Sequence, residues 1–223
     1  MPRIPRIITE EGVFHIISRG NNKQWIFKDD DDFNAFLELL RRHKKERPFS
    51  LYHYVLLNNH FHLILEPHIG QTISKILQGI KLSYVYHFRR KYNFVGHLFQ
   101  DRFKSILIQK EKYLLTCGAY IELNPVRANV VRMPEEYPYS SSGYYLKGRT
   151  SDIIDPDPYY LALGDDDRAR RKRYREIIDE QRKQKESYSI GNYIGTEEYE
   201  KEIFKNYGIK RVAGKRGRPR KGL

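Results

Sequence analysis

Cysteine is nearly absent from this sequence of 223 residues, which contains only Cys117. A single cysteine cannot form an internal disulfide, and it cannot supply the thiolate cluster of a structural zinc site. The composition therefore excludes both a disulfide framework and a cysteine-based zinc site. We expect Cys117 to be a small buried residue.

Long apolar runs are absent as well. No stretch approaches the roughly 18 residues of a membrane-spanning helix. The opening segment MPRIPRIITEEG lacks the apolar core of a signal peptide, and no internal repeat is visible. We therefore expect a soluble cytoplasmic protein that has no membrane partner.

Acidic residues are too few to balance the basic ones, and the formal net charge is +13 with a pI near 9.6. That balance favours a polyanionic partner, either a nucleic acid or an anionic membrane surface. Seven lysine and arginine residues and no acid lie in the last 16 residues, 208–223, which leaves +6 on the first 207. This tail has too little apolar surface to fold alone, so we expect it to be disordered when free.

The spacing of apolar residues predicts seven elements before Pro125, because alternation indicates strands and a period near 3.6 indicates helices. Strands are expected at 12–19, at 51–57, from 60 onward, and within 97–109 with a bend near Asp101. Helices are expected from Asp30 to before Pro48, from a cap at Thr72, and over 111–124, where Pro125 stops the helix. Asn58 and Asn59 suit a tight turn, so the second and third strands should pair antiparallel.

This order of elements, β-α-β-β-α-β-α, predicts an α+β fold. The first six elements match the ferredoxin-like split βαβ arrangement, a single antiparallel sheet with helices on one face. The seventh element, a helix, is then free to cover the other face. We divide the chain into a domain at 1–145, an extension of loops and a charged helix at 146–207 that packs on or flanks the core, and the basic tail at 208–223.

Two histidines stand one position apart in the third strand, within NNHFHLILEP. Side chains alternate along a strand, so His60, His62 and Glu66 share one face, and the residues between them form a core face. Two neutral imidazoles on one face can bind a divalent cation. The alternative is a pair of histidines that are hydrogen-bonded or exposed. Glu66 can orient one imidazole or serve only on the surface.

Tyr120 and Asn124 lie four residues apart in the seventh element and so share one side of the predicted helix. A tyrosine hydroxyl can attack a phosphorus atom, and an amide oxygen one turn away can complete a metal site with two histidines. Because the sequence has 18 tyrosines, simple packing of Tyr120 on the sheet is an open alternative.

Three segments, VLLNNHFHLILEP, LFQDRFKSILIQ and YIELNPVRANVV, resemble the single-tyrosine HUH transposases, and within them the REP-associated tyrosine transposases. HUH denotes histidine, a bulky hydrophobic residue and histidine, here His60, Phe61 and His62. The opening FHIISRGNNKQWIF is also similar to the first strand and turn of that family. The resemblance covers roughly residues 10–145, and it implies that the first domain is an HUH single-tyrosine transposase domain.

The resemblance implies an enzyme that cleaves and rejoins single-stranded DNA at REP-like hairpins. Tyr120 corresponds to the nucleophile, which forms a 5′-phosphotyrosine and leaves a free 3′-OH. His60, His62 and Asn124 correspond to the ligands of a Mg²⁺ or Mn²⁺ ion. Attack by a different 3′-OH on the phosphotyrosine then joins new ends.

Candidate contacts to the DNA backbone are Arg102, Lys104 and Arg127, which lie near the implied site in sequence, with solvated surface charges as the alternative. In the tail, Arg216 and Arg218 stand in an Arg-Gly-Arg-Pro segment that resembles an AT-hook. Generic attraction to phosphate is the alternative for the tail.

Two rival functions are open. The first is an HUH nickase or domesticated endonuclease that cleaves without joining, which would use the same residues. The second is a binding module without catalysis, since a ferredoxin-like sheet with exposed aromatics also binds single strands in RRM-type domains. The sequence lacks the aromatic-rich run of an RRM, and that module would leave Tyr120 and Asn124 unexplained. Whether the protein acts as a monomer or a homodimer is undetermined.

Overall fold

The structure is a computed structural model, and it describes residues 12–184 and 191–209. Its elements follow one another in this order: β1 (Val13–Arg19), η1 (Asn21–Lys23), α1 (Asp30–Glu46), β2 (Phe49–Leu57), β3 (His60–Pro67), α2 (Ile73–Tyr92), β4 (Lys104–Ile108), α3 (Lys110–Glu122), α4 (Asn124–Arg127), η2 (Pro134–Glu136), α5 (Ser142–Lys147), α6 (Pro158–Leu161), α7 (Asp167–Lys183), β5 (Tyr193–Ile194) and α8 (Glu197–Tyr207).

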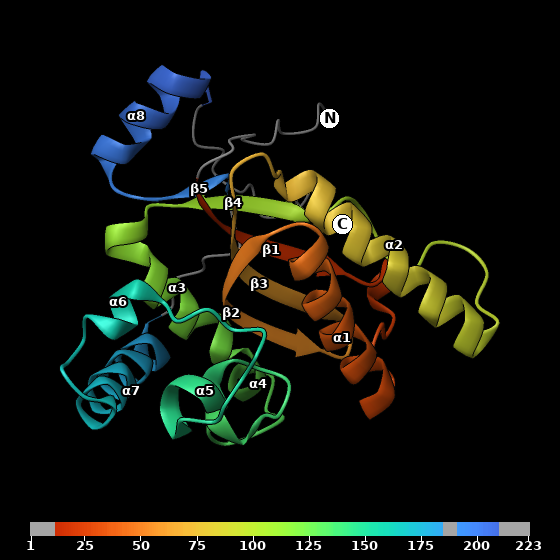
Figure 1. Ribbon diagram of the computed structural model, residues 1–223, viewed down its shortest axis with the longest axis horizontal. Helices are drawn as coiled ribbons and strands as arrows, with labels where there is room; N and C mark the ends of the chain where they lie inside the picture. The colour runs from red at the N-terminus through yellow and green to blue at the C-terminus, as the bar shows by residue number, and fades with distance from the viewer. Residues whose placement is uncertain (1–11, 185–190, 210–223) are drawn as a thin grey trace, which may run out of the picture.

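One five-stranded sheet has the strand order β2-β3-β1-β4-β5. The first four strands pair antiparallel, and β5 adds a short parallel strand beside β4. The order of those four strands is that of the split βαβ arrangement. The predicted α+β fold is therefore confirmed, with α1 and α2 on one face of the sheet and α3 on the other (Figure 1).

Alternation along the strands gives the sheet two apolar faces. Facing α1 and α2, Phe61 and Leu63 of β3 are fully buried in the larger core cluster. On the opposite face, Ile64 packs in a second cluster with Leu114 and Ile121 of α3. The seventh element thus covers the face that carries the two histidines, as expected.

Two helix starts follow from single polar side chains. The Asp29 carboxylate accepts from the backbone N–H of Asp32 ahead of α1, and the Thr72 hydroxyl accepts from the backbone N–H of Lys75 ahead of α2. Such an N-cap contributes about 1 kcal/mol to helix stability. The predicted cap at Thr72 is confirmed.

Two predicted boundaries are wrong. The fourth strand is confined to Lys104–Ile108, and before it only Phe99 makes an isolated bridge, to Gly20. Pro125 does not stop α3, which ends at Glu122; it lies in the first turn of α4. Proline is tolerated there because the N–H that it lacks has no partner within the helix.

The extension packs closely on α3. The short helix α5 leads into the extension, part of the region predicted as loops forms the short helix α6, and the charged helix α7 buries Tyr174 and Ile178 on one side. Figure 1 shows these helices gathered around α3, away from α1 and α2. The strand β5 and the helix α8 have no counterpart among the predicted elements.

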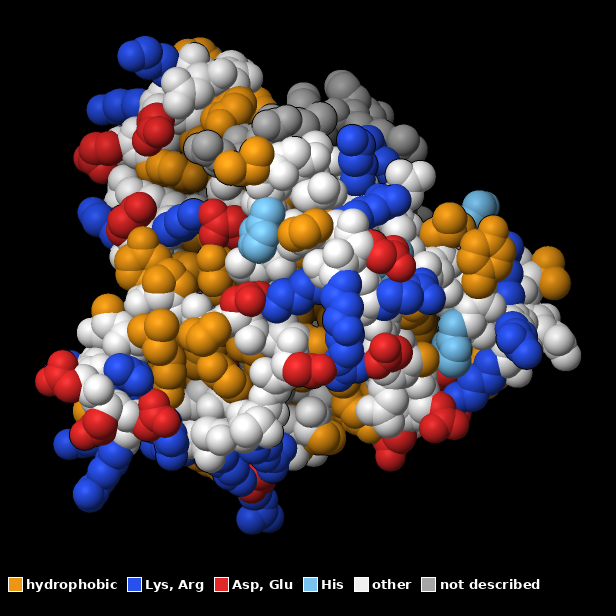
Figure 2. Space-filling model, in the orientation of Figure 1, with side chains coloured by type: hydrophobic (Ala, Val, Ile, Leu, Met, Phe, Trp, Pro, Cys, Tyr) orange, Lys and Arg blue, Asp and Glu red, His pale blue; other side chains and the backbone are white. Residues whose placement is uncertain are grey.

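Basic side chains do not form one uninterrupted field on the face seen in Figure 2, where acidic side chains lie beside many of them. Several are paired, as Arg41 is with Asp152 and Lys44 with Asp155. Within the part of the chain that the structure describes, none of the helices has the length and apolar content needed to span a bilayer.

Candidate functional site

A hollow opens where β1, β3 and β4 meet the start of α4. The side chains that line it include the three predicted ligands His60, His62 and Asn124, the basic residues Arg19, Arg102 and Lys104, and also Gln100 and Asp101. They come from segments far apart in the sequence, and antiparallel pairing brings those segments together because His60 lies opposite Arg19 and Lys104 opposite Ile17. Two predicted ligand positions on β3 and one on α4 therefore share a single hollow with two predicted DNA contacts.

The imidazoles of His60 and His62 are each held through Nδ1. Nδ1 of His60 donates to Oδ1 of Asn59 at 2.6 Å, and Nδ1 of His62 lies 2.8 Å from Nε2 of the buried His15. Among the described residues, neither Nε2 atom has a hydrogen-bond partner. The Asn59 oxygen requires the proton of His60 on Nδ1, and His62 carries its proton on Nδ1 when it donates to His15. In that tautomer each ring keeps a lone pair on Nε2, which is the arrangement a metal-binding histidine needs.

Both histidines are neutral over the physiological range. Burial lowers the pKa of His60 to about 4, and the charge of Arg19 adds to this effect. Burial also lowers the pKa of His62 well below its usual value, with further contributions from His15, His60 and Arg19. Neutral imidazole is the form that binds a cation, and the loss of charge is caused mainly by desolvation.

Asn124 lines the same hollow. It is the first residue of α4, and its Nδ2 donates to the carbonyl of Ile121 at 2.9 Å. Since the amide nitrogen is held by this bond, Oδ1 is the atom available as a ligand. Two imidazole nitrogens and one amide oxygen fit a divalent cation that takes its other ligands from water and phosphate. Within residues 12–184 and 191–209, no three His, Cys, Asp or Glu side chains cluster in a way that could hold a metal ion. A three-ligand site at the two histidines therefore depends on Asn124.

Tyr120 lies on α3, one turn before Asn124. Its half-buried ring packs against the apolar cluster between α3 and the sheet, on the face that carries the histidines. The guanidinium of Arg127 lies 4.6 Å from the ring centroid and donates to the Tyr120 carbonyl at 2.9 Å and to the Gln181 carbonyl at 3.2 Å. Tyr120 is not one of the residues that line the hollow; Asn124, four residues later, is.

The predicted DNA contacts occupy different settings. Arg102 and Lys104 are exposed at the hollow. Arg127 also reaches solvent, but its guanidinium is engaged with Tyr120 and the extension. Arg216 and Arg218 lie outside the described residues, and their minor-groove role stays a prediction that competition between A·T-rich and G·C-rich duplexes tests.

Sequence reasoning missed two residues of the site: Arg19, which lines the hollow, and the buried His15, which lies beneath it. His15 supports His62, and Arg19 adds a positive charge beside His60. Alternation along the first predicted strand places both on one face, so the signal was present. That alternation could not be interpreted from the sequence alone, because only the pairing of β1 with β3 sets His15 and Arg19 beside His60 and His62.

Of the two roles left open for Glu66, the structure does not support that of orienting an imidazole. Its carboxylate accepts from the hydroxyl of Tyr52 at 2.6 Å and forms an ion pair with Lys110. Glu66 does lie on the face that carries the histidines, but at the far end of β3, where these two partners occupy both of its oxygens.

Comparison with known proteins places the hollow within a matched region. The family model for IS200-like transposases matches residues 9–124. The fold is similar to the solved structure of a REP-associated tyrosine transposase bound to a REP hairpin, with 20% identity, a TM-score of 0.58, and coverage of 70% of this chain and 94% of that one. A transposase candidate from Deinococcus radiodurans R1 is 12% identical, with a TM-score of 0.39 and coverage of 58% and 92%. No curated protein matches the sequence.

Proposed function

Because this chain belongs to the IS200-like transposase family, we propose that it cleaves and rejoins single-stranded DNA at hairpins through a covalent tyrosine intermediate. The observation that carries the proposal is the convergence of His60, His62 and Asn124 on one hollow, with Tyr120 one turn away on the same face of the sheet. The hairpin is the ligand named for the similar solved structure, and it enters here as the proposed substrate.

Cleavage by Tyr120 is a transesterification. The phenol oxygen attacks the scissile phosphorus and loses its proton, while the bond from phosphorus to the 3′ oxygen breaks and that oxygen leaves as a 3′-OH. The product is a 5′-phosphotyrosine that conserves the energy of the broken ester. A 3′-OH from another strand can therefore reverse the reaction and join new ends.

His60, His62 and Asn124 would hold the divalent cation, Mg²⁺ or Mn²⁺. When bound, the cation supplies a Lewis acid that neutralises charge developing on the phosphate. The chain's own residues prepare that site: His15 and Asn59 fix the two rings, so no reorganisation is needed when the ligands engage. Arg127, stacked on the Tyr120 ring, restricts the orientation of the phenol.

The proposed activity is tested with an end-labelled hairpin that carries a single-stranded flank, incubated with the protein and Mg²⁺ or Mn²⁺. We expect a denaturant-resistant protein–DNA adduct and, with a second strand that offers a 3′-OH, a rejoined product. An adduct without any rejoined product supports the nickase. Binding without an adduct, across all hairpins tried, supports the non-catalytic module and contradicts the proposal.

Lys and Arg side chains at the hollow are expected to attract the DNA backbone. Replacing Arg102 and Lys104 together by alanine should weaken hairpin binding and lower the slope of log Kd against log salt by about two, one for each phosphate that is no longer neutralised. Fluorescence anisotropy over a salt series measures this slope. Arg41→Ala, which removes a cation already paired with Asp152, is the matched control and should leave the slope unchanged; equal slopes in all three proteins would contradict these contacts.

A further inference from the structure

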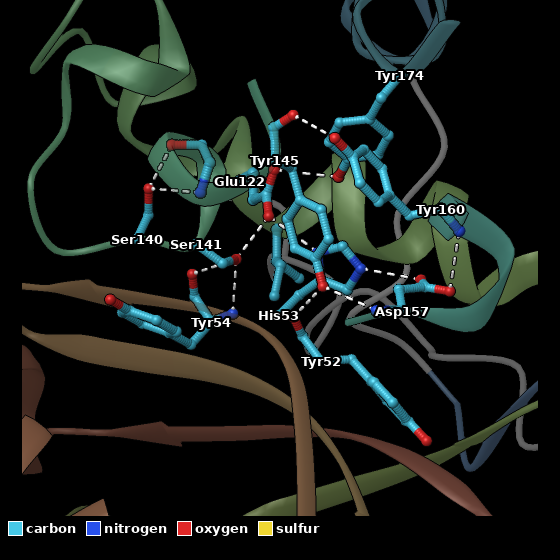
Figure 3. Close-up of polar contacts among 12 residues, drawn as sticks. Tyr52, His53, Tyr54, Glu122, Ser140, Ser141, Tyr145, Asp157, Tyr160 and Tyr174 are labelled. Atoms are coloured by element: carbon cyan, nitrogen blue, oxygen red, sulfur yellow. Dashed lines mark hydrogen bonds and ion pairs between the residues drawn. The ribbon is translucent and has the colours of Figure 1, made fainter. Parts of the chain in front are cut away.

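On the face of the sheet that carries the histidines, a charged network is buried without access to solvent. His53 of β2, Glu122 of α3 and Asp157 before α6 are each 0% exposed. Nδ1 of His53 lies 2.9 Å from Oε1 of Glu122, and its Nε2 lies 3.0 Å from Oδ2 of Asp157 (Figure 3). Since both ring nitrogens face carboxylates, both donate a proton, and the ring is an imidazolium.

His53 stays protonated in spite of its burial because of these two carboxylates. Burial alone would lower the pKa of His53, but the hydrogen bonds to Asp157 and Glu122 outweigh it and raise the pKa to about 9. The Glu122 carboxylate also accepts hydrogen bonds from the hydroxyls of Ser141, at 2.5 Å, and Tyr174, at 3.0 Å. The network is therefore satisfied on all sides, which a buried ion pair requires if it is not to destabilise the fold.

Two local features bring His53 to α3. The register of β2 against β3 shifts between Leu51 and His53, so that Tyr52 and His53 both turn to the face of Ile64; a bulge of this kind re-aims a side chain. On the helix, a Cβ added to Gly118 would lie 2.6 Å from the His53 ring. Only glycine at that position lets the ring approach α3 so closely.

The network joins the two halves of the candidate site, which are the histidine pair on β3 and the helices α3 and α4 that carry Tyr120 and Asn124. His53 pairs with Ile64 on β3, two residues from His62. Glu122 lies on α3 between Tyr120 and Asn124. Asp157 and Tyr174 belong to the extension, which contributes to the network from outside the region that the family model matches. Because none of the three charged groups is exposed, they cannot contact substrate.

We propose that the His53–Glu122–Asp157 network is a positioning device that fixes α3 and α4 against β3, so that the two halves of the candidate site stay in register. This inference rests on the proposed function. It also gives the extension a role, which is to anchor the helix that carries Tyr120 rather than to contact DNA.

The network also predicts how stability depends on pH. The titratable groups that face the His53 ring are Glu122, Asp157, Tyr145 and Tyr174, and burial raises the pKa of both tyrosines well above their usual value, so they stay neutral. Folding raises the pKa of His53, so its protonated form stabilises the folded protein. This contribution is complete at a pH below the pKa of the unfolded state, and it is lost as the pH rises through the pKa of the folded state. The thermal midpoint of the wild type should therefore fall between pH 6.5 and about 9 more steeply than that of His53→Gln.

The decisive experiment compares His53→Gln with wild type in three measurements: Mn²⁺ affinity by electron paramagnetic resonance, the single-turnover rate of adduct formation, and hairpin Kd. We expect Mn²⁺ affinity and adduct rate each to fall roughly tenfold to a hundredfold, as for loss of an outer-shell partner of a metal ligand, while hairpin Kd is unchanged. His43→Gln is the control, since His43 is also buried but bonds Ser83 between α1 and α2. Even if it lowers the thermal midpoint as much as His53→Gln does, it should leave both the Mn²⁺ affinity and the adduct rate unchanged.

If His53→Gln does not fold, Tyr174→Phe, which deletes one hydroxyl of the network, replaces it and should reduce both quantities severalfold. A folded variant with wild-type Mn²⁺ affinity and adduct rate overturns the positioning role alone. A wild type that binds Mn²⁺ but forms no adduct overturns the proposed function alone, because Mn²⁺ affinity still tests the positioning. A wild type that does neither overturns both.

Discussion

Tyr120→Phe is expected to abolish the covalent protein–DNA adduct, with a loss of at least about a thousandfold, because no other group then supplies the attacking oxygen. The change removes one oxygen and keeps the aromatic ring, which packs between α3 and the sheet under the Arg127 guanidinium. Folding and hairpin binding should therefore be retained. Denaturing gel electrophoresis of labelled hairpin measures the adduct, and anisotropy measures the binding.

Tyr113→Phe is the matched control for that prediction. Tyr113 stands on the same helix and packs, partly buried, against the same apolar cluster as Tyr120. The control should form the adduct at the wild-type rate. Persistence of the adduct in Tyr120→Phe would move the nucleophile to another residue, and loss in both variants would point to a general effect on α3.

His60→Ala is expected to reduce adduct formation by more than about a hundredfold, which exceeds the usual cost of losing a partner of a metal ligand. His60 is the less buried of the two histidines, so its removal leaves the core face of β3 intact. Mn²⁺ affinity should fall in parallel, and a chelator should have the same effect on the wild type. Both readouts are needed, because the loss of activity alone does not report on the cation.

His68→Ala provides the comparison for His60→Ala. His68 follows β3 at the other end of the strand, where its Nε2 bonds the Ser50 hydroxyl at 3.0 Å. This variant should keep wild-type Mn²⁺ affinity and adduct rate. Wild-type behaviour of His60→Ala in both assays would remove the imidazole pair from the reaction.

The sequence was sufficient where the governing interactions are local. The turn at Asn58 and Asn59, and the alternation that puts His60 and His62 opposite Phe61, depend on residues within a few positions of one another. The strand order followed as well, since hairpins and βαβ units leave few ways to arrange four strands. These features confirm the predicted fold and account for the shared face of the two histidines.

Prediction failed where the deciding partner lies far along the chain. His53 reads as an ordinary strand residue, and only the register shift and the carboxylates of Glu122 and Asp157, 69 and 104 residues away, turn it into a buried cation. The charged helix α7 was expected only to pack on or flank the core as part of the extension, yet Tyr174 on it completes the same network. Burial of charge depends on partners that no local pattern reveals.

In the proposed mechanism, two imidazoles and one amide of a single chain hold a cation beside the phenol that attacks DNA. Anomalous scattering from crystals of Tyr120→Phe grown with hairpin DNA and Mn²⁺ tests it most directly. We expect one strong manganese peak within bonding distance of Nε2 of both histidines on β3 and of Oδ1 of Asn124, with the scissile phosphate facing the ring at position 120. A peak bound by other residues, or a phosphate on the far side of the sheet from that ring, would contradict it.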